Sequence, residues 1–314
     1  MSKRQLAMVI DINKCLGCHT CTIADKNMWL RGEGQEYMCW NNVETRPGKG
    51  FPANWERLGG GWKDGEIHLG KLPALEDYGI PWSWDWEQLP HIAPQVAPTW
   101  GPNWEEDVGA GDYPNVWYFY LARPCNHCTK PACVAACPRK AVYKRDEDGI
   151  VLIDQERCRG YRYCVRACPY KKPYFNAIRY KSEKCIFCFP RVEQGVPPAC
   201  VGQCPGRIRF FGYLDDREGP VYKLVKEFQV ALPLHPELVT EPNVYYIPPL
   251  SPPRVDAQGR PGGEGRIPVE YLESLFGPQV RQVLSRLEAE LAAARLGKPS
   301  ELVATLISNH RWRI

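Results

Sequence analysis

The sequence predicts an α+β protein with two small modules in a pseudo-two-fold relation, a loop-rich insertion, and a partner-wrapping C-terminal tail with short helices. Three observations support this fold class. All but one of the 15 cysteines lie in four tight runs. A phrase of apolar residues, Ile-Asp and a cysteine occurs more than once. The 30 prolines and 27 glycines indicate short elements joined by many turns.

The composition limits the kind of protein this is. A formal charge of +4 is small for 314 residues, so no nucleic-acid-binding surface is expected. No run of about 18 apolar residues exists to span a membrane, and the N-terminal apolar stretch is too short for a secretory signal. The 15 cysteines are odd in number and mostly clustered, which favours metal ligands over disulfides. If the protein works outside the cytoplasm, a partner must carry it there already folded.

The spacing of the four cysteine runs is typical of bacterial ferredoxins. That pattern is C-x2-C-x2-C-x3-C-P, in which three thiolates bind one iron–sulfur cluster and the fourth binds its neighbour. Three of the runs end in Cys-Pro, where the proline ring fixes φ and helps to turn the backbone away. The four runs predict two ferredoxin-like 2×(4Fe-4S) modules. The runs are Cys15, Cys18 and Cys21; Cys125, Cys128, Cys133 and Cys137; Cys158, Cys164 and Cys168; and Cys185, Cys188, Cys200 and Cys204.

Two places in the runs hold other residues. Tyr161 stands where the third run should have its second ligand, and a cubane with one open corner tends to lose that iron, so a 3Fe-4S cluster with Tyr161 as its lid is expected. Asp25 stands at the fourth place of the first run, where a carboxylate would be a harder ligand than a thiolate. A water, a second 3Fe-4S cluster, or Cys39 recruited from a distance are the alternatives to Asp25. Otherwise Cys39 is expected to be a buried thiol.

Crossed sharing of ligands pairs the first run with the fourth and the second with the third. Three 4Fe-4S clusters and one 3Fe-4S cluster need fifteen ligands, which the clustered cysteines and Asp25 supply. The result is a row of four centres. Group one (4Fe-4S) is Cys15, Cys18, Cys21 and Cys204; group two (4Fe-4S) is Cys185, Cys188, Cys200 and Asp25; group three (4Fe-4S) is Cys125, Cys128, Cys133 and Cys168; group four (3Fe-4S) is Cys137, Cys158 and Cys164.

The repeated phrase also suggests where the modules begin and end. AMVIDINKC, IVLIDQERC and, more loosely, AIRYKSEKC each predict a strand followed by a ligand. Residues 1–39 with 175–214 are expected to form the first module, and residues 118–174 the second. Residues 40–117 hold nine of the eleven tryptophans, in phrases such as PWSWDWEQLP, and predict an irregular packed insertion that supplies local core or a partner surface.

Residues 215–314 are expected to form the tail. Val221 to Pro253 predict an extended, proline-rich stretch. Apolar residues from Val269 to Leu291 then recur on one helical face, which Gly277-Pro278 divides into two helices. Ser300 is expected to cap a last short helix. Such a tail has little core of its own and is expected to wrap a partner.

Other residues near the runs have more than one interpretation. Zinc needs four ligands per ion and leaves no use for three cysteines in seven residues followed by Cys-Pro. His19 and His127 are expected to hydrogen-bond near the ligands rather than bind iron. No nucleotide loop, serine elbow or acid pair predicts a catalytic site. Basic residues after the runs either offset the negative charge of the clusters or lie on a solvated surface: Arg139, Lys140, Lys171, Lys172, Arg207 and Arg209.

Longer phrases resemble a known family. CLGCHTC, YMCWNNVETRPGKGFPANWE, CNHCTKPACVAACP and ALPLHPEL are similar to the iron–sulfur beta subunit of respiratory nitrate reductase and nitrite oxidoreductase, in the type II dimethyl-sulfoxide-reductase family. The resemblance implies an electron-transfer subunit of an oxidoreductase complex. Its partners would be an alpha subunit with molybdenum-bis(pterin guanine dinucleotide) and a haem b gamma subunit or cytochrome. These partners would attach the protein to a membrane, and the side of the membrane on which it lies is left open.

The resemblance is not uniform. Nitrate reductases usually have Cys where this chain has Asp25 and Trp where it has Tyr161, and these two residues are more similar to nitrite oxidoreductase. The substrate is therefore left open between nitrate reduction and nitrite oxidation. Selenate, chlorate, perchlorate, dimethyl sulfide and hydrocarbon oxidoreductases use similar beta subunits. The alternative of a different class is a zinc-stabilised assembly scaffold.

Overall fold

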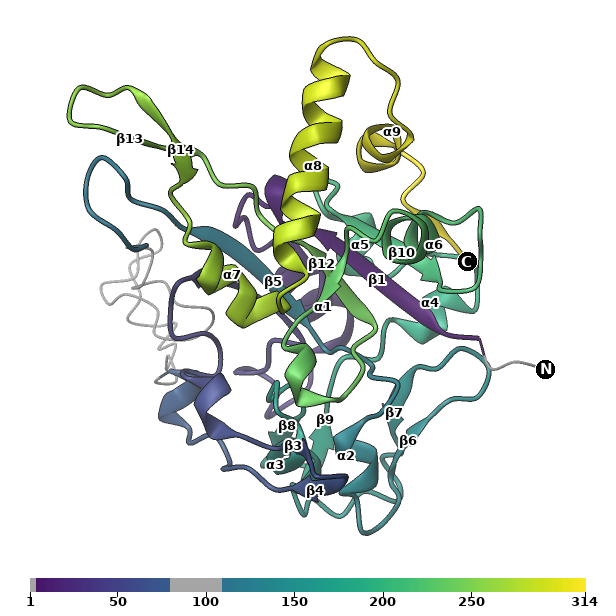
Figure 1. Cartoon of the computed structure of the whole chain (residues 1–314). Coiled ribbons are helices and arrows are strands. Elements are labelled where there is room, and N and C mark those ends of the chain that lie inside the picture. The colour runs from purple at the N-terminus through teal and green to yellow at the C-terminus, as the bar shows by residue number, and fades with distance from the viewer. Residues whose placement is uncertain (1–3, 80–108) are drawn as a thin grey trace, which may run out of the picture.

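A five-stranded mixed sheet forms the centre of the computed structural model, which describes residues 4–79 and 109–314. The strand order is β11-β12-β1-β10-β15. β1 pairs antiparallel with β10 and parallel with β12. All six residues of β1 are buried because strands flank it on both sides (Figure 1). The strands of this sheet are β1 (Leu6–Asp11), β10 (Arg209–Tyr213), β11 (Leu232–Pro233), β12 (Val244–Ile247) and β15 (Trp312–Arg313).

The remaining strands form two-stranded antiparallel sheets. The hairpin β13–β14 projects from the body of the molecule (Figure 1). The others lie close to the cysteine runs or to the insertion. The pairs are β2 (Asn41–Arg46) with β5 (Phe119–Pro124), β3 (Gly61–Lys63) with β4 (Glu66–His68), β6 (Val142–Lys144) with β7 (Val151–Ile153), β8 (Tyr174–Asn176) with β9 (Lys181–Glu183), and β13 (Pro253–Val255) with β14 (Pro261–Gly265).

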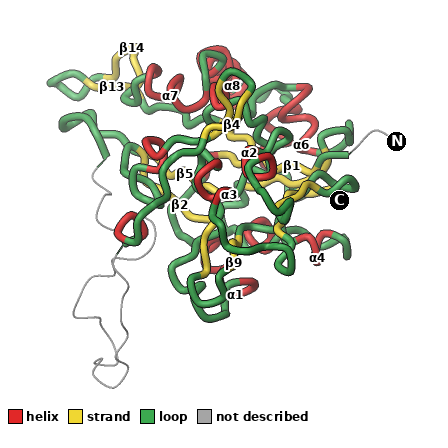
Figure 2. The backbone as a smooth tube through the Cα atoms, turned by 90° about the horizontal axis from the view of Figure 1, so that it is seen from below, coloured by secondary structure: helices red, strands yellow, loops and turns green. Residues whose placement is uncertain are grey.

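In each of the three repeated phrases, a strand precedes the cysteine. These strands are β1, β7 and β9. Short helices then follow within or after the runs. α1 packs on α5 and α2 packs on α3, and Figure 2 shows α2 and α3 side by side. The mixed α and β character agrees with the predicted class, while the pseudo-two-fold relation of two modules stays a prediction. The helices are α1 (Thr20–Trp29), α2 (Ala132–Ala135), α3 (Tyr163–Ala167), α4 (Phe189–Val192) and α5 (Ala199–Gly202).

The insertion is more regular than its sequence predicts. Asn41–Arg46 is mostly polar, yet it forms β2, and every residue of this strand is buried. Glu44 on β2 forms an ion pair of 2.7 Å with Arg123 on β5, and this pairing allows two charged side chains to be buried. Trp55 is 1% exposed and belongs to the main core. The phrase PWSWDWEQLP lies outside the described residues.

The tail differs in part from the prediction. Val221 to Glu227 are helical rather than extended, because Pro220 starts a helical turn and Leu224 is buried. Gly277 ends one helix as expected, and the Ser300 hydroxyl caps another by accepting from the Val303 N–H. The helices are α6 (Pro220–Tyr222), a π-helical turn (Lys223–Glu227), α7 (Val269–Phe276), α8 (Val280–Arg295) and α9 (Glu301–Ile307).

The apolar face of the tail helices packs on this chain. Leu272 and Leu275 of α7 and Val283 of α8 are buried in the same core as Ile10 of β1. The tail also adds β11, β12 and β15 to the central sheet. The tail therefore shares the main core of this chain rather than forming one of its own. Its contact with a partner stays a prediction.

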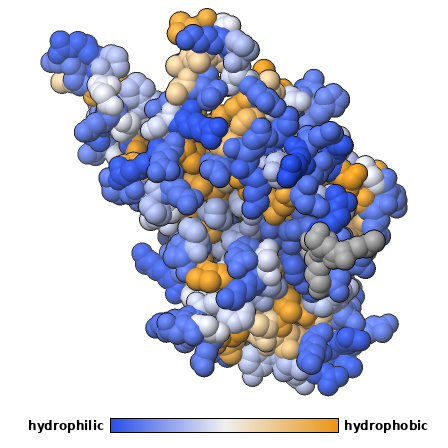
Figure 3. Space-filling view, turned by 45° about the vertical axis from the view of Figure 1, so that its right-hand side comes forward, coloured by the Kyte–Doolittle hydropathy of each residue, from blue (hydrophilic) through white to orange (hydrophobic). Residues whose placement is uncertain are grey.

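No helix in residues 4–79 and 109–314 is long and apolar enough to cross a membrane. On the face seen in Figure 3, apolar side chains lie in separate patches among polar ones.

Candidate metal centres

The four runs share one local geometry. The cysteine at the third ligand place of each run is the second residue of a helix, on α1, α2, α3 or α5. The fourth ligand lies four residues later, close to one helical turn further along. Gly160 in the third run has φ of 67°, and a Cβ there would lie 2.6 Å from the Tyr180 carbonyl oxygen, so glycine is required beside the ligand Cys158.

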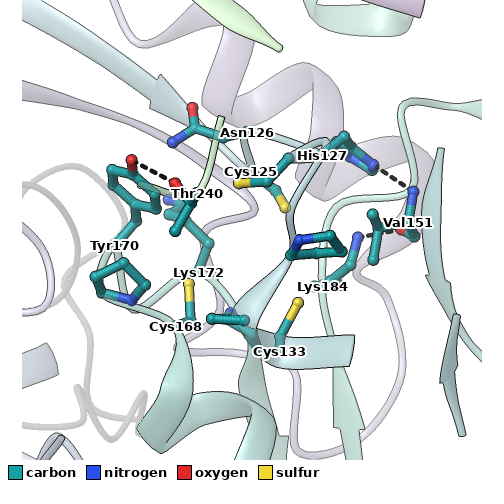
Figure 4. A pocket seen from close by; sticks show the side chains of 15 residues that line it. Cys125, Asn126, His127, Cys133, Val151, Cys168, Tyr170, Lys172, Lys184 and Thr240 are labelled. Carbon is teal, nitrogen blue, oxygen red and sulfur yellow. Dashed lines mark hydrogen bonds between the residues drawn. The ribbon is translucent and has the colours of Figure 1, made fainter. Parts of the chain in front are cut away.

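The ligands predicted for group three surround one cavity. Cys125, Cys128, Cys133 and Cys168 all line it. Figure 4 shows the sulfur atoms of Cys125, Cys133 and Cys168 on different walls. Burial raises the pKa of the Cys128 thiol, and the charges of Cys125 and Cys168 raise it further. The structure therefore brings together cysteines from two runs, as crossed sharing predicts.

Group four surrounds a second cavity, which Cys137, Cys158 and Cys164 line. Burial raises the pKa of Cys164 to about 12; the Ser182 hydrogen bond lowers it, while Cys158 and Cys137 raise it. Tyr161 lines the same cavity but is 58% exposed, so its ring lies at the mouth. The role of Tyr161 as a lid stays a prediction.

Groups one and two also assemble from distant runs. Burial raises the pKa of Cys15 to about 11, and the charges of Cys21 and Cys204 contribute to this rise. Cys18 is exposed, so group one lies at the surface. In group two, burial and the charge of Asp25 raise the pKa of Cys200, with smaller contributions from the other members, Cys188 and Cys185.

Asp25 lies on α1 and is 2% exposed. Burial raises its pKa to about 7, although Arg209 and Lys172 lower it. Within the described residues, its Oδ2 atom has no hydrogen-bond partner. A buried carboxylate oxygen without a partner is destabilising, and binding to a metal ion would give it a partner. The donor set of group two therefore fits a bound cluster.

Cys39 is buried, as expected for a structural thiol. Burial raises its pKa, and Asp25 is near enough for its charge to raise it further. The Tyr174 hydroxyl donates to the Cys39 carbonyl oxygen at 2.6 Å, which fixes this segment. Cys39 thus lies near group two, although it is distant in sequence from the run that supplies three of its ligands.

The four groups follow one another in space. Arg209 has charge interactions with Cys21 of group one and with Cys200 of group two. Cys125 of group three raises the pKa of Cys185 of group two. Cys168 of group three raises the pKa of Cys164 of group four. These interactions place the four groups of side chains in the order one, two, three, four, and a row of four clusters stays a prediction. Among residues 4–79 and 109–314, no three His, Cys, Asp or Glu side chains converge on a point that could hold a single metal ion.

The predicted basic residues fall into two sets. Lys171, Lys172 and Arg209 are buried, whereas Arg139, Lys140 and Arg207 are exposed on the surface. Burial lowers the pKa of Lys172 to about 7, so this amine needs nearby negative charge to stay protonated. Buried cations beside thiolates fit negatively charged clusters.

Several groups that hydrogen-bond to ligand sulfurs could not be read from the cysteine spacing. The Trp29 Nε1–H donates to Cys188 Sγ at 3.1 Å. Trp29 follows Asp25 by four residues on α1, so helical periodicity was the available signal. Backbone N–H groups of Ser182 and Ala141 donate to ligand sulfurs at 3.4 and 3.3 Å. These bonds come from backbone geometry, which residue identity does not reveal.

The two histidines remain beside the ligands. His127 is buried, and its Nδ1 accepts from the Val151 N–H at 3.1 Å. Burial lowers its pKa well below 6.5, and Lys184 and Lys144 lower it further, so the ring is neutral. His19 precedes α1 in a left-handed backbone conformation. Neither histidine replaces a cysteine of its run.

Comparisons with known proteins identify a 4Fe-4S domain in this chain. A family profile described as a 4Fe-4S dicluster domain matches residues 116–214, which contain the second, third and fourth runs. The chain is 57% identical to the dimethylsulfide dehydrogenase subunit beta of Rhodovulum sulfidophilum and 58% identical to the chlorate reductase subunit beta of Ideonella dechloratans, each over 98% of this chain and 97% of the relative. It is 56% identical to the respiratory nitrate reductase subunit beta of Haloferax mediterranei, over 98% of this chain and 92% of the relative.

Proposed function

This chain belongs to the family of iron–sulfur beta subunits of type II molybdenum oxidoreductases, and we propose that its four ligand groups form one electron path between two partner subunits. It is an electron-transfer subunit and not the catalytic subunit of its complex. The observation that carries the proposal is the meeting of distant runs, such as Cys15 with Cys204 and Cys128 with Cys168. Neighbouring groups are close enough for their charges to interact, which suits transfer from one to the next.

In this proposal, groups one, two and three each hold a 4Fe-4S cluster and group four holds a 3Fe-4S cluster. Thiolate ligation is supported by the cavity that the four sulfurs of group three surround. The role of Asp25 is supported by its buried oxygen without a partner. The 3Fe-4S assignment is supported by the three cysteines, and Tyr161 at the open side, that line the cavity of group four. When bound, such clusters accept and release single electrons.

The two ends of the row support contact with partners. Beside group one, Leu16 is 66% exposed and Ile23 is also exposed. Beside group four, Tyr161 and Tyr180 are exposed, and the Tyr180 carbonyl lies against Gly160. Large apolar and aromatic side chains are enriched in the cores of protein interfaces. A catalytic subunit at one end and an electron-exchanging subunit at the other would cover both patches.

The family sets the class of partner. We propose a catalytic alpha subunit with molybdenum-bis(pterin guanine dinucleotide), and a haem b gamma subunit or a cytochrome through which the complex is attached to a membrane. As the substrate of the complex, we propose nitrate or nitrite. Relatives named for dimethyl sulfide, chlorate and nitrate share 56–58% identity with this chain, so the beta subunit tolerates a change of substrate.

Metal analysis of anaerobically purified protein tests the proposal. We expect a brown protein with about 15 irons per chain and four distinct centres in electron paramagnetic resonance (EPR) spectra. A colourless protein that holds zinc, or one with fewer than three centres, would refute it. Co-purification of a tagged chain with the product of its neighbouring molybdoenzyme gene tests the partner separately.

A further inference from the structure

Two buried cations lie between neighbouring ligand groups. Arg209, at the start of β10, is 0% exposed, and Lys184, just after β9, is 2% exposed. A charge taken out of water is strongly destabilising unless an opposite charge lies beside it. Their counter-charges therefore need to be identified.

Within the described part of the chain, both side chains donate hydrogen bonds to neutral atoms. Arg209 donates to Asn41 Oδ1 at 2.9 Å and to Met8 Sδ at 3.4 Å, and its buried Nε has no acceptor there. Lys184 donates to the carbonyl oxygens of Val151 and Cys185. Arg123 offers a contrast, because it is equally buried but pairs with a carboxylate of this chain. Arg209 and Lys184 thus lack the ion pair that stabilises Arg123.

Proposed cluster ligands supply negative charge beside both residues. Burial alone would lower the pKa of Arg209, but Cys21 and Cys204 of group one and Cys200 and Asp25 of group two raise it. Lys184 has charge interactions with Cys133 of group three and Cys185 of group two. Each cation therefore faces ligands of two successive groups.

We propose, on the basis of the electron path proposed above, that Arg209 and Lys184 are shared counter-ions, each of which raises the reduction potentials of the two clusters beside it. A reduced cluster has one more negative charge than its oxidised form, so a nearby cation favours reduction. An electron that crosses from one cluster to the next stays close to the same cation. The cation therefore attracts the electron on either cluster. The difference in energy between the electron on one cluster and on the next stays small.

Other basic residues near the runs provide the comparison. Lys172 also has charge interactions with Asp25 and Cys125, but Glu44 of this chain provides it with a carboxylate counter-charge. Arg207 lies two residues before Arg209 and is exposed, and its guanidinium donates to Asn309. Solvent screens an exposed charge, so Arg207 should have little effect on any cluster. It is the matched control for Arg209.

Potentiometric titration of the purified complex, read by EPR spectroscopy, tests the proposal. Arg209→Met should lower the potentials of centres one and two, each by at least a tenfold change in the ratio of reduced to oxidised cluster, or about 59 mV for one electron. Lys184→Met should lower those of centres two and three by a similar ratio. Neither should move centre four. Arg207→Met should move none, and Arg209→Lys should keep most of the wild-type potentials.

The two centres whose potentials shift together in each variant decide the outcome. A shift in one centre only, in all four equally, or in none would overturn the shared role. If a methionine variant loses iron, it must lose the two adjoining centres and keep the other two, and any other loss would also overturn it. Wild-type protein without iron–sulfur centres would instead refute the proposed function itself.

Discussion

Glu44 provides the counter-charge that secures the walls of group three. Its carboxylate accepts from Arg123 Nε at 2.7 Å and from the backbone N–H of Phe51 at 3.1 Å. Arg123 precedes Cys125 by two residues and donates to the carbonyl oxygen of Tyr170, two residues after Cys168, at 2.6 Å. One buried ion pair therefore joins the segments that bear two of the ligands proposed for group three.

We expect Glu44→Gln to destabilise the fold by about 3–5 kcal/mol, the usual cost of leaving a buried charge without its partner. Both side chains of the pair are 0% exposed, so water cannot replace the lost charge. Burial would raise the pKa of Glu44, but Arg123 and Arg46 lower it, so the native carboxylate is ionised. Arg46 keeps Glu56 as a second partner, whereas Arg123 keeps only neutral acceptors among the described residues.

Anaerobic urea unfolding, followed by tryptophan fluorescence, measures this loss because Trp55 packs against Arg123. Asp256→Asn is the control, since its pair with Arg260 lies on the exposed hairpin and should not change the midpoint. We also expect the Glu44 variant to lose iron from group three before the other groups. A loss below about 1 kcal/mol, the range of surface ion pairs, would show that the charge is not needed there.

Three further predictions concern individual ligands. Asp25→Ala should remove or alter the EPR signal of centre two, because its only non-thiolate ligand is gone; four unchanged centres would exclude ligation by Asp25. Tyr161→Cys should convert the 3Fe-4S centre to 4Fe-4S by supplying the missing thiolate, which raises the iron content by about one per chain. Persistence of three irons at that centre would contradict the ligand spacing. Trp29→Phe removes the 3.1 Å N–H···S bond to Cys188, and should lower the potential of centre two, since such bonds stabilise the reduced cluster. Trp62→Phe removes a comparable indole bond to a carbonyl oxygen at 3.0 Å and should leave all potentials unchanged; equal shifts in both tryptophan variants would argue against a specific effect on the sulfur.

Local sequence was enough to predict several elements, and it also groups the cysteines into the four runs from which the cluster ligands are proposed. The cluster determines how far apart its cysteines lie along the chain, so the runs are visible without tertiary structure. The strand before Cys15 and the Ser300 cap are also local, because each depends on residues within one short segment. Gly277 ends α7 for the same reason, since glycine tolerates its φ of 81°.

Only the tertiary structure decided which polar residues are inside. The strand Asn41–Arg46 has no apolar alternation, and it is buried because Arg123, 79 residues away, neutralises Glu44. Lys184 and Arg139 both adjoin ligands, yet one is buried between two groups and the other is in solvent. Composition cannot separate them, because burial of a charge depends on what the rest of the chain places beside it. The order of the four groups has the same origin, since their proximity depends on packing between segments far apart in the sequence.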